Sequence, residues 1–184
     1  MADQARLEET GSGQVPTSEG WFVVNVRDTA WESTGDYGAR CRFENRDEVP
    51  FEHVGMNIRV LQPGQPNCLY HAESPEEHFL VLHGECLLLV EEEERLLRAW
   101  DFVHCPPNTR HVFVGAGEGP CAILMVGARL PADWVVYPVS VLARRHGAGV
   151  ETETNSPKIA YEGREDARFE RPSGWGDLPW ARLR

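Results

Sequence analysis

The residues best suited to chemistry in this chain are two histidines and two glutamates that lie in two short stretches. His71, Glu73 and Glu77 fall within seven residues of one another, and His111 follows a turn rich in proline. Imidazole nitrogens and carboxylate oxygens are common ligands of divalent first-row metals. The four side chains therefore predict a metal site assembled from two separate segments.

Strand geometry would bring these side chains together. On a strand, residues two apart share a face, so His71 and Glu73 would project together. Ser74 and Pro75 predict a chain reversal, and Glu77 would then begin a second strand. If both faces line one interior, an imidazole and a carboxylate converge, and a third ligand must come from elsewhere. His111, at the start of a later strand, is the best-placed candidate.

The rest of the chain predicts short strands separated by turn residues. We expect strands at 21–26, 39–43, 56–61, 79–82, 85–90, 95–98 and 121–126, and on both sides of the turn at 106–108. The acidic run 91–94 is predicted to be a solvated hairpin tip. Closely spaced strands without a long helical period favour an all-β sandwich or barrel.

Composition divides the chain into three parts. Residues 1–20 are polar and rich in Gly, Ser, Thr and Glu, which predicts a disordered tail. Residues 21–130 hold the predicted barrel. Residues 131–184 are irregular in pattern, with one short helix expected at 140–146, and we expect this C-terminal extension to pack on the barrel or on a partner subunit.

Charge and composition exclude several classes of function. The net charge of -11 argues against nucleic acid as a partner, and it favours a neutral or cationic small-molecule ligand. No apolar run is long enough to span a membrane, and the polar N-terminus does not resemble a signal peptide, so we expect no membrane partner and a cytoplasmic location. Five cysteines without a C-x-x-C pair predict reduced thiols.

Residues 56–127 resemble the cupin superfamily. The first cupin motif corresponds to Gly64, His71, Glu73, Glu77 and Gly84, with Glu73 where a second histidine commonly stands. The second motif corresponds to Trp100, Pro106, Asn108 and His111, with Trp100 and Asn108 in place of glycines. The resemblance implies a double-stranded β-helix, or jelly-roll barrel, with irregular terminal extensions and at most one short helix. It also implies a homodimer, to which the apolar segment 134–141 could contribute.

Residues 70–84 are also similar to the metal-binding stretch of the 3-hydroxyanthranilate dioxygenases. That resemblance implies that His71, Glu77 and His111 hold Fe2+. The arginines that bind the substrate carboxylate in those enzymes correspond to Asn67 and Gly115 here, so the same substrate is not expected. The segment W-D-F-V-H-C-P at 100–106 is similar to that of single-domain bacterial cupins.

The ligand set leaves three functions open. Two histidines and one carboxylate form the ligand set of non-haem Fe2+ oxygenases, with Phe79, Val81, Phe102 and Phe113 as candidate apolar lining. If Glu73 also binds, or acts as a base, the site suits a metal-dependent isomerase of a sugar or sugar phosphate. The third reading is a non-catalytic cupin that binds a small ligand. Fe2+ is the expected metal, with Mn2+, Zn2+ and Ni2+ as alternatives.

Overall fold

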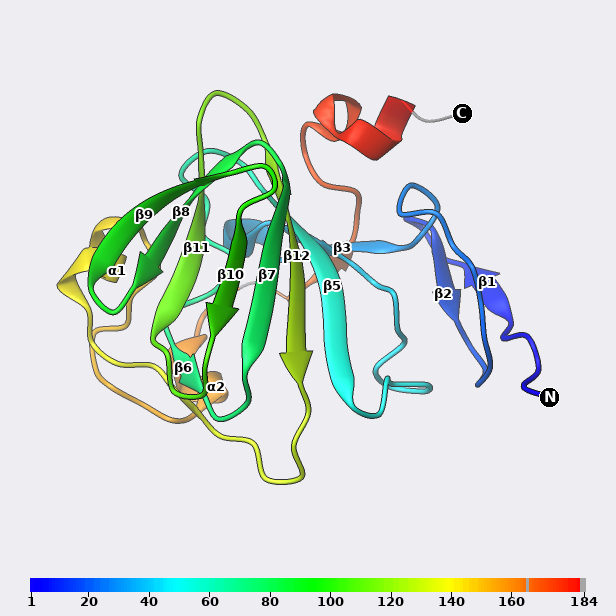
Figure 1. The fold of residues 1–184 in the computed structure, drawn as a ribbon, viewed down its shortest axis with the longest axis horizontal. Coiled ribbons are helices and arrows are strands. Elements are labelled where there is room, and N and C mark those ends of the chain that lie inside the picture. Colours follow the sequence, from blue (N-terminus) through cyan, green and yellow to red (C-terminus); the bar gives the residue numbers. More distant parts are fainter. Residues whose placement is uncertain (165, 183–184) are drawn as a thin grey trace.

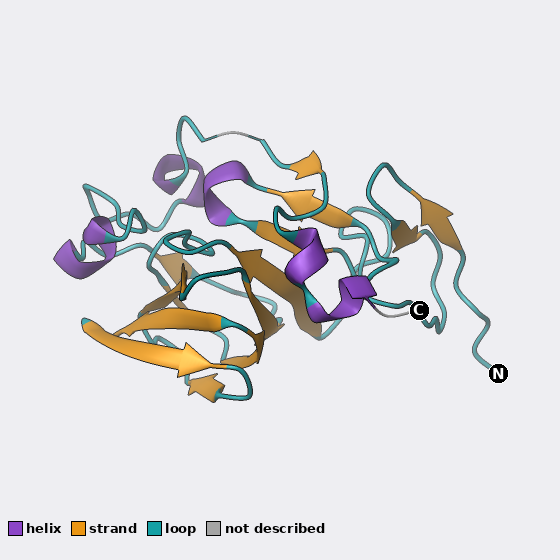
Figure 2. Ribbon diagram, turned by 90° about the horizontal axis from the view of Figure 1, so that it is seen from above, coloured by secondary structure: helices purple, strands orange, loops and turns teal. Residues whose placement is uncertain are grey.

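The protein folds into two β-sheets that face each other, with few and short helices around them (Figures 1 and 2). The structure is a computed structural model that describes residues 1–164 and 166–182. The larger sheet has the order β10 (Phe102–Cys105), β7 (Glu77–His83), β12 (Cys121–Ala128), β5 (Val54–Leu61), β4 (Ala39–Cys41), β3 (Trp31–Ser33) and β14 (Arg168–Phe169).

The second sheet has the order β11 (His111–Ala116), β8 (Glu85–Val90) and β9 (Glu93–Arg98). Two further pairs join β13 (Val135–Val136) to β6 (Ala72–Glu73), and β1 (Leu7–Glu9) to β2 (Gln14–Pro16). The helical segments are α1 (Val141–Arg145), α2 (Pro157–Ala160), and the 3-10 turns η1 (Gly35–Tyr37), η2 (Trp175–Asp177) and η3 (Pro179–Arg182). No helix among the described residues is long and apolar enough to cross a membrane.

Strand β12 has apolar side chains on both faces, and each face packs in a different apolar cluster. Its side chains alternate, so that Ile123 and Met125 point into the space between the sheets while Ala122 and Leu124 point outward. The inner face packs with Phe79 and other residues of the barrel core. Because both faces of β12 are covered, the strand is apolar along much of its length rather than alternating with polar residues.

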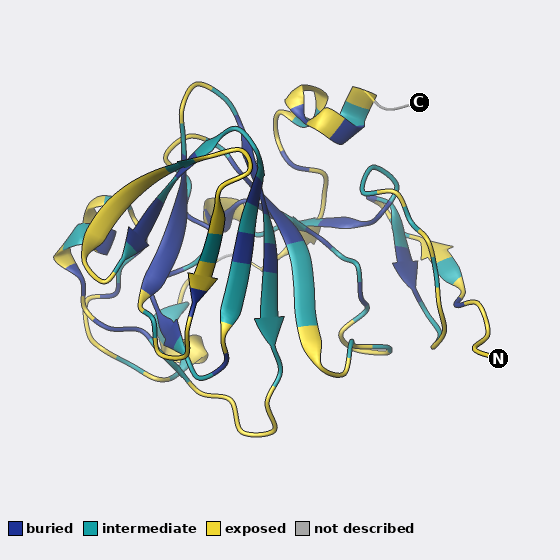
Figure 3. Cartoon of the chain, viewed as in Figure 1, coloured by how far each residue is buried: buried dark blue, intermediate teal, exposed yellow. Residues whose placement is uncertain are grey.

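The burial of a strand depends on whether it lies at the edge of its sheet. Strand β11 is buried along nearly all of its length, whereas β9, at the edge of the smaller sheet, is largely exposed (Figure 3). The C-terminal extension covers the outer face of the larger sheet, where Leu178 and Trp180 pack with Trp31, Ile58 and Val60. The extension also adds β14 to that sheet and β13 to β6.

The all-β prediction is confirmed, as are the strands expected at 39–43, 56–61 and 121–126 and the short helix after Ser140. The expectation of at most one short helix is wrong, because α2 is a second one; its four residues are too few to show a helical period. The strand expected at 21–26 is wrong. Trp21 forms only an isolated bridge to Gln4, and Val23 is 83% exposed, so this β-prone segment has no sheet to pack against.

Residues 1–20, predicted to be a disordered tail, instead contain the antiparallel pair β1–β2. Its register pairs Leu7 with Pro16 and Glu9 with Gln14. Ala5 and Val15 are buried, which gives this polar segment the few apolar contacts that hold it in place. The amino-acid composition of residues 1–20 did not predict these local contacts.

Trp100 and Asn108, which replace the glycines of the second motif, keep a backbone conformation typical of glycine. Trp100 has φ +79° and Asn108 has φ +68°, so both adopt the left-handed conformation that glycine adopts without strain. Asn tolerates this region well, whereas Trp does not. The backbone turn is thus kept at both positions although the glycines are absent.

Candidate metal centre

Both predicted segments line one cavity of about 730 Å3 between the two sheets. His71, Glu73, Glu77 and His111 all contribute to its wall. His71 and His111 are almost fully buried, and Glu77 is mostly buried. The structure therefore brings together the four side chains that the spacing singled out.

The two histidines start from adjacent backbone positions. His71 and His111 form an antiparallel bridge, with N–H to O distances of 3.2 Å and 2.8 Å. Cross-strand partners project to the same face, so the two rings lie side by side with their centroids 5.0 Å apart. The pairing of the backbones thus sets the separation of the imidazoles.

Backbone carbonyls fix the orientation of both rings. Nδ1 of His71 lies 2.7 Å from the carbonyl oxygen of Leu69, and Nδ1 of His111 lies 3.0 Å from that of Thr109. A carbonyl oxygen can only accept, so each Nδ1 must carry the proton and donate. In the neutral form of each ring the lone pair is then on Nε2, which is the arrangement that a metal ligand needs.

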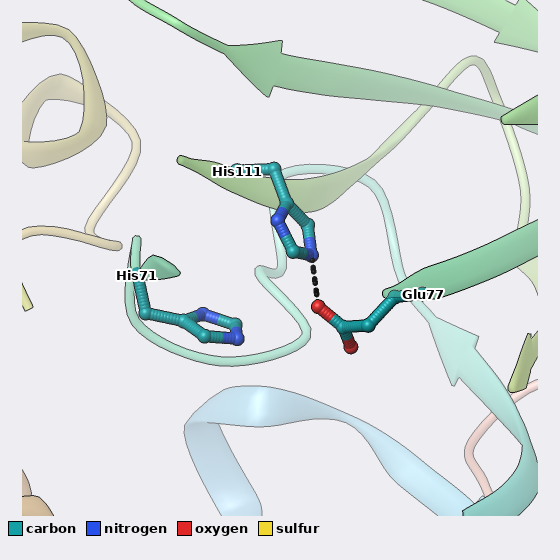
Figure 4. Close-up of side chains that lie close together, drawn as sticks. All are labelled: His71, Glu77 and His111. Atoms are coloured by element: carbon teal, nitrogen blue, oxygen red, sulfur yellow. Dashed lines mark ion pairs between the residues drawn. The ribbon is translucent and has the colours of Figure 1, made fainter. Parts of the chain in front are cut away.

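Glu77 brings a carboxylate to the two imidazoles from the start of β7 (Figure 4). Its Oε2 lies 3.4 Å from Nε2 of His111. One ligand atom from each of His71, Glu77 and His111 lies within 4.8 Å of the others. Two nitrogens and one oxygen at this separation fit the donor set of a single divalent metal ion.

Glu73 stands beside the three but is not part of the converging group. Its Oε1 lies 3.3 Å from Nε2 of His71, and its side chain is 36% exposed toward the cavity. Burial acts to raise the pKa of Glu73, but the hydrogen bond and charge of His71 outweigh it and the pKa is lowered. Glu73 is therefore a carboxylate at the edge of the centre.

The pKa values of the side chains in the centre are shifted, because charged groups lie close together and are buried. Burial, and then the charge of Glu73, raise the pKa of Glu77 to about 7. Burial, and then the nearby His71, lower the pKa of His111 to about 4. Burial acts to lower the pKa of His71, but Cys68 and Glu73 outweigh it and the pKa is raised. A divalent cation bound here would displace protons from these side chains, because metal ligands bind in their deprotonated form.

The floor of the cavity is aromatic. The ring of Phe79 packs 5.2 Å from that of His111 and 4.7 Å from that of Phe113, and Val81 is fully buried. Of the four candidate lining residues, only Phe79 lines the cavity. Val81 and Phe113 are buried in the core behind it, and Phe102 is 63% exposed, so the prediction was wrong for these three. Apolar groups below the imidazoles limit the access of water.

Asn67 and Gly115 offer no positive charge for a substrate carboxylate. The side chain of Asn67 accepts a hydrogen bond from the backbone N–H of Phe113 at 2.8 Å, so it stabilises β11. A Cβ on Gly115 would lie 2.1 Å from the carbonyl oxygen of Gln62, so no side chain fits there. The expectation that this cavity takes a different substrate from the 3-hydroxyanthranilate dioxygenases agrees with both observations.

Several cavity residues carry no sequence signal. Tyr137 and Tyr161 come from the C-terminal extension, and the ring of Tyr137 lies 6.0 Å from that of His71. The hydroxyl of Tyr161 accepts a hydrogen bond from the backbone N–H of Leu69 at 3.0 Å. Arg40 and Arg59, on β4 and β5, line the opposite wall. These residues reach the cavity only through the tertiary fold.

A second group of possible ligands lies outside the cavity. Glu76, His78 and His104 lie on the outer side of β7 and β10, with Nε2 of His78 3.1 Å from Nδ1 of His104. Glu76 and His104 are exposed, and the ring of Phe102 stacks on His78. These residues lie outside the predicted site, and the cavity lies on the other face of the strands.

The family model described as "Cupin domain" matches residues 57–127. This span includes both motifs and runs from within β5 to within β12, and it agrees with the resemblance seen at 56–127. Residues 57–127 are therefore similar to a cupin domain. No curated protein matches the sequence.

Solved structures with the cupin fold resemble this chain. A candidate sugar phosphate isomerase from Acidithiobacillus ferrooxidans is 28% identical, with a TM-score of 0.48 over 53% of this chain and 64% of that one. A sugar phosphate isomerase of the cupin superfamily from Silicibacter pomeroyi is 24% identical, with a TM-score of 0.49 over 56% and 66%.

The polyketide cyclase RemF from Streptomyces resistomycificus is 16% identical, with a TM-score of 0.52 over 61% of this chain and 83% of that one. At this level of identity the likeness concerns the fold alone. This chain spans less than two thirds of the length of each of the two isomerase structures.

Proposed function

We propose that the cupin domain binds one divalent metal ion through His71, Glu77 and His111, and that it is a mononuclear oxygenase acting on a small organic molecule. The observation that carries the proposal is the convergence of one ring nitrogen from each histidine and one carboxylate oxygen within 4.8 Å inside a cavity. Fe2+ is the first candidate, and Mn2+, Zn2+ and Ni2+ fit the same donors.

Three protein ligands on one side of a metal leave coordination positions free on the other side. When bound, such an ion would supply Lewis acidity and, as Fe2+, the dioxygen chemistry of sites with two histidines and one carboxylate. The cavity of about 730 Å3 leaves room for a small molecule beside these positions.

The side chains around the centre have separate tasks in this proposal. The carbonyl oxygens of Leu69 and Thr109 hold the rings with Nε2 toward the cavity. Phe79 and Phe113 keep bulk water away from the floor, which protects reactive species from side reactions. Tyr137 is placed to contact a ligand that lies over His71.

Glu73 favours a second candidate function, a metal-dependent isomerase of a sugar or sugar phosphate. Its carboxylate lies on the cavity wall, 3.3 Å from His71, and its pKa is lowered, so it is ionised at neutral pH. A carboxylate in this position could take a proton from a carbon next to a carbonyl group and return it to the neighbouring carbon. Such a reaction consumes no oxygen.

Nitric oxide tests whether the metal has free coordination positions. The protein would be loaded with Fe2+ under argon and exposed to nitric oxide, and the electron paramagnetic resonance spectrum recorded. The oxygenase proposal expects the signal of a high-spin iron nitrosyl, and it expects none from the His111→Ala variant. Iron that binds to the wild type without forming this adduct would mean a closed structural site and would contradict the proposal. Substrate turnover that persists in the strict absence of oxygen would favour the isomerase.

A further inference from the structure

Arg59 is a buried cation without a counter-ion. It lies on β5, is only 9% exposed, and lines the same cavity as the metal centre. Its Nη1 donates weakly to two neutral oxygens, Thr34 Oγ1 at 3.4 Å and the carbonyl of Tyr37 at 3.3 Å. Its Nε has no hydrogen-bond partner, and no carboxylate within residues 1–164 and 166–182 forms an ion pair with it. Burying an unpaired charge is costly.

A second cation stands beside it. Arg40 of β4 pairs directly with Arg59 across the two strands, so both side chains share one face. Arg40 and Arg42 share the single carboxylate of Glu32, at 2.8 Å and 3.2 Å, which leaves no negative charge for Arg59. Burial, and then the charge of Arg40, lower the pKa of Arg59 to about 10, so its guanidinium stays charged at neutral pH.

The basic wall faces the same space as the metal centre. Cys68 lines the cavity with Arg59 on one side, and on the other side its Sγ lies 3.6 Å from Nδ1 of His71. Arg46 also contributes to the wall. A ligand that occupies the cavity would therefore contact guanidinium groups at one end and the metal-binding side chains at the other.

We propose that Arg59, with Arg40 beside it, binds the anionic group of a small-molecule ligand, a carboxylate or a phosphate. The proposal deepens the proposed function, because it names the class of ligand for the same cavity. An anion in the cavity would pair with the Arg59 guanidinium and relieve the repulsion between the two guanidinium groups. The planar fork of arginine matches both carboxylate and phosphate oxygens.

This inference replaces the expectation of a neutral or cationic ligand. That expectation came from the net charge of -11, which is an average over the whole surface. Ligand selection depends instead on the charges that line the cavity, and the wall at β4 and β5 is basic.

Thermal denaturation of the metal-free protein tests the proposal. Melting would be followed in chloride, in inorganic phosphate and in acetate at constant ionic strength, so that phosphate and carboxylate are compared directly. The variants are Arg59→Met, which keeps most of the side-chain volume, and Arg95→Met, a control on the exposed edge strand β9. We expect at least one anion to raise the Tm of the wild type and of Arg95→Met, and the shift to vanish in Arg59→Met. We also expect Arg59→Met to melt no lower than the wild type in chloride.

An equal anion shift in Arg59→Met, or no shift in the wild type with either anion, would overturn the proposal. If Arg59→Met does not fold, wild-type crystals soaked in selenate give the answer. The proposal requires an anion within hydrogen-bonding distance of the Arg59 guanidinium, and a cavity without anion density there contradicts it. The metal content of Arg59→Met distinguishes the anion site from the metal site. It stays at the wild-type level if only the anion site is lost.

Discussion

His71 and His111 exchange two backbone hydrogen bonds, and this bridge places the two imidazoles of the candidate centre. The bridge joins the loop before β6 to the first residue of β11, two segments that are forty residues apart in the sequence. Because backbone pairing sets the ring separation and carbonyl groups set the ring orientation, the centre needs little rearrangement to accept an ion.

The two glutamates are predicted to differ in their contribution to metal binding. Glu77→Gln removes the carboxylate that converges with both imidazoles, so we expect metal affinity to fall by about 100-fold or more. Glu73→Gln lies outside the converging group, and we expect metal affinity to change by less than about tenfold. Titration of the metal-free variants with Fe2+ or Zn2+ by calorimetry would measure both. Equal losses in the two variants would make Glu73 a fourth ligand.

Glu44 is predicted to hold the loop at the mouth of the cavity. Its buried carboxylate lies 2.6 Å from Arg129 and accepts a hydrogen bond from the backbone N–H of Phe51 at 2.7 Å. Glu44→Gln removes the carboxylate that pairs with Arg129, so we expect a loss of roughly 2–3 kcal/mol in the free energy of unfolding. This loss is small for a broken buried ion pair, because Arg129 is partly exposed. Urea denaturation measures the change, with Glu52→Gln, an exposed neighbour, as the control.

The effect of Glu44 should depend on pH. Burial acts to raise the pKa of Glu44, but Arg129 and the Phe51 N–H outweigh it, so the folded pKa lies below the unfolded value of about 4.3. A lowered pKa stabilises the folded state above the unfolded pKa, and this contribution is lost as the pH falls through the folded pKa. The difference between wild type and Glu44→Gln should therefore be full at pH 7 and shrink below about pH 4.3. A difference that grows in acid would contradict this assignment.

Trp100 is predicted to strain the turn before β10. It adopts φ +79° and its side chain is 74% exposed, so it gains little from packing. The left-handed conformation costs a residue with a Cβ roughly 1–2 kcal/mol. Trp100→Gly should raise the free energy of unfolding by about 1 kcal/mol, whereas Trp100→Ala, which keeps a Cβ, should gain less. Thermal melts of the three proteins would show the order, and a lower Tm for Trp100→Gly would contradict it.

The homodimer stays a prediction that the exposed apolar residues of the C-terminal extension support. Trp134, Val139 and Val141 are each close to half exposed, and they lie within one short stretch. We expect light scattering to give the mass of a dimer and Trp134→Glu to shift the protein toward the monomer, because the charge would have to be buried in the interface. A wild-type monomer at high concentration would remove the expectation.

The sequence predicted the placement of the candidate side chains where the information is local. The alternation of side chains around Glu77 and the turn before His111 placed both residues on inward faces. Those features depend only on the two-residue period of strands and on turn residues. At the two motif positions where cupins commonly have glycine, Trp100 and Asn108 both have a positive φ.

The sequence could not predict what the tertiary fold brings to the cavity. Arg59 lies in an ordinary apolar strand, and Tyr137 lies in a segment without a motif. Their places follow from the pairing of β4 with β5 and of β13 with β6, which no local pattern records. The net charge has the same limit, since it does not say which residues face inward.

The metal content of purified protein tests the central claim most directly. Wild-type protein and the His111→Ala variant would be expressed without added metal, purified in parallel, and analysed by inductively coupled plasma mass spectrometry. We predict close to one equivalent of a first-row divalent metal in the wild type and a strongly reduced content in folded His111→Ala. Wild-type protein that holds no such metal, and that takes up none when Fe2+, Mn2+, Zn2+ or Ni2+ is supplied, would contradict the account.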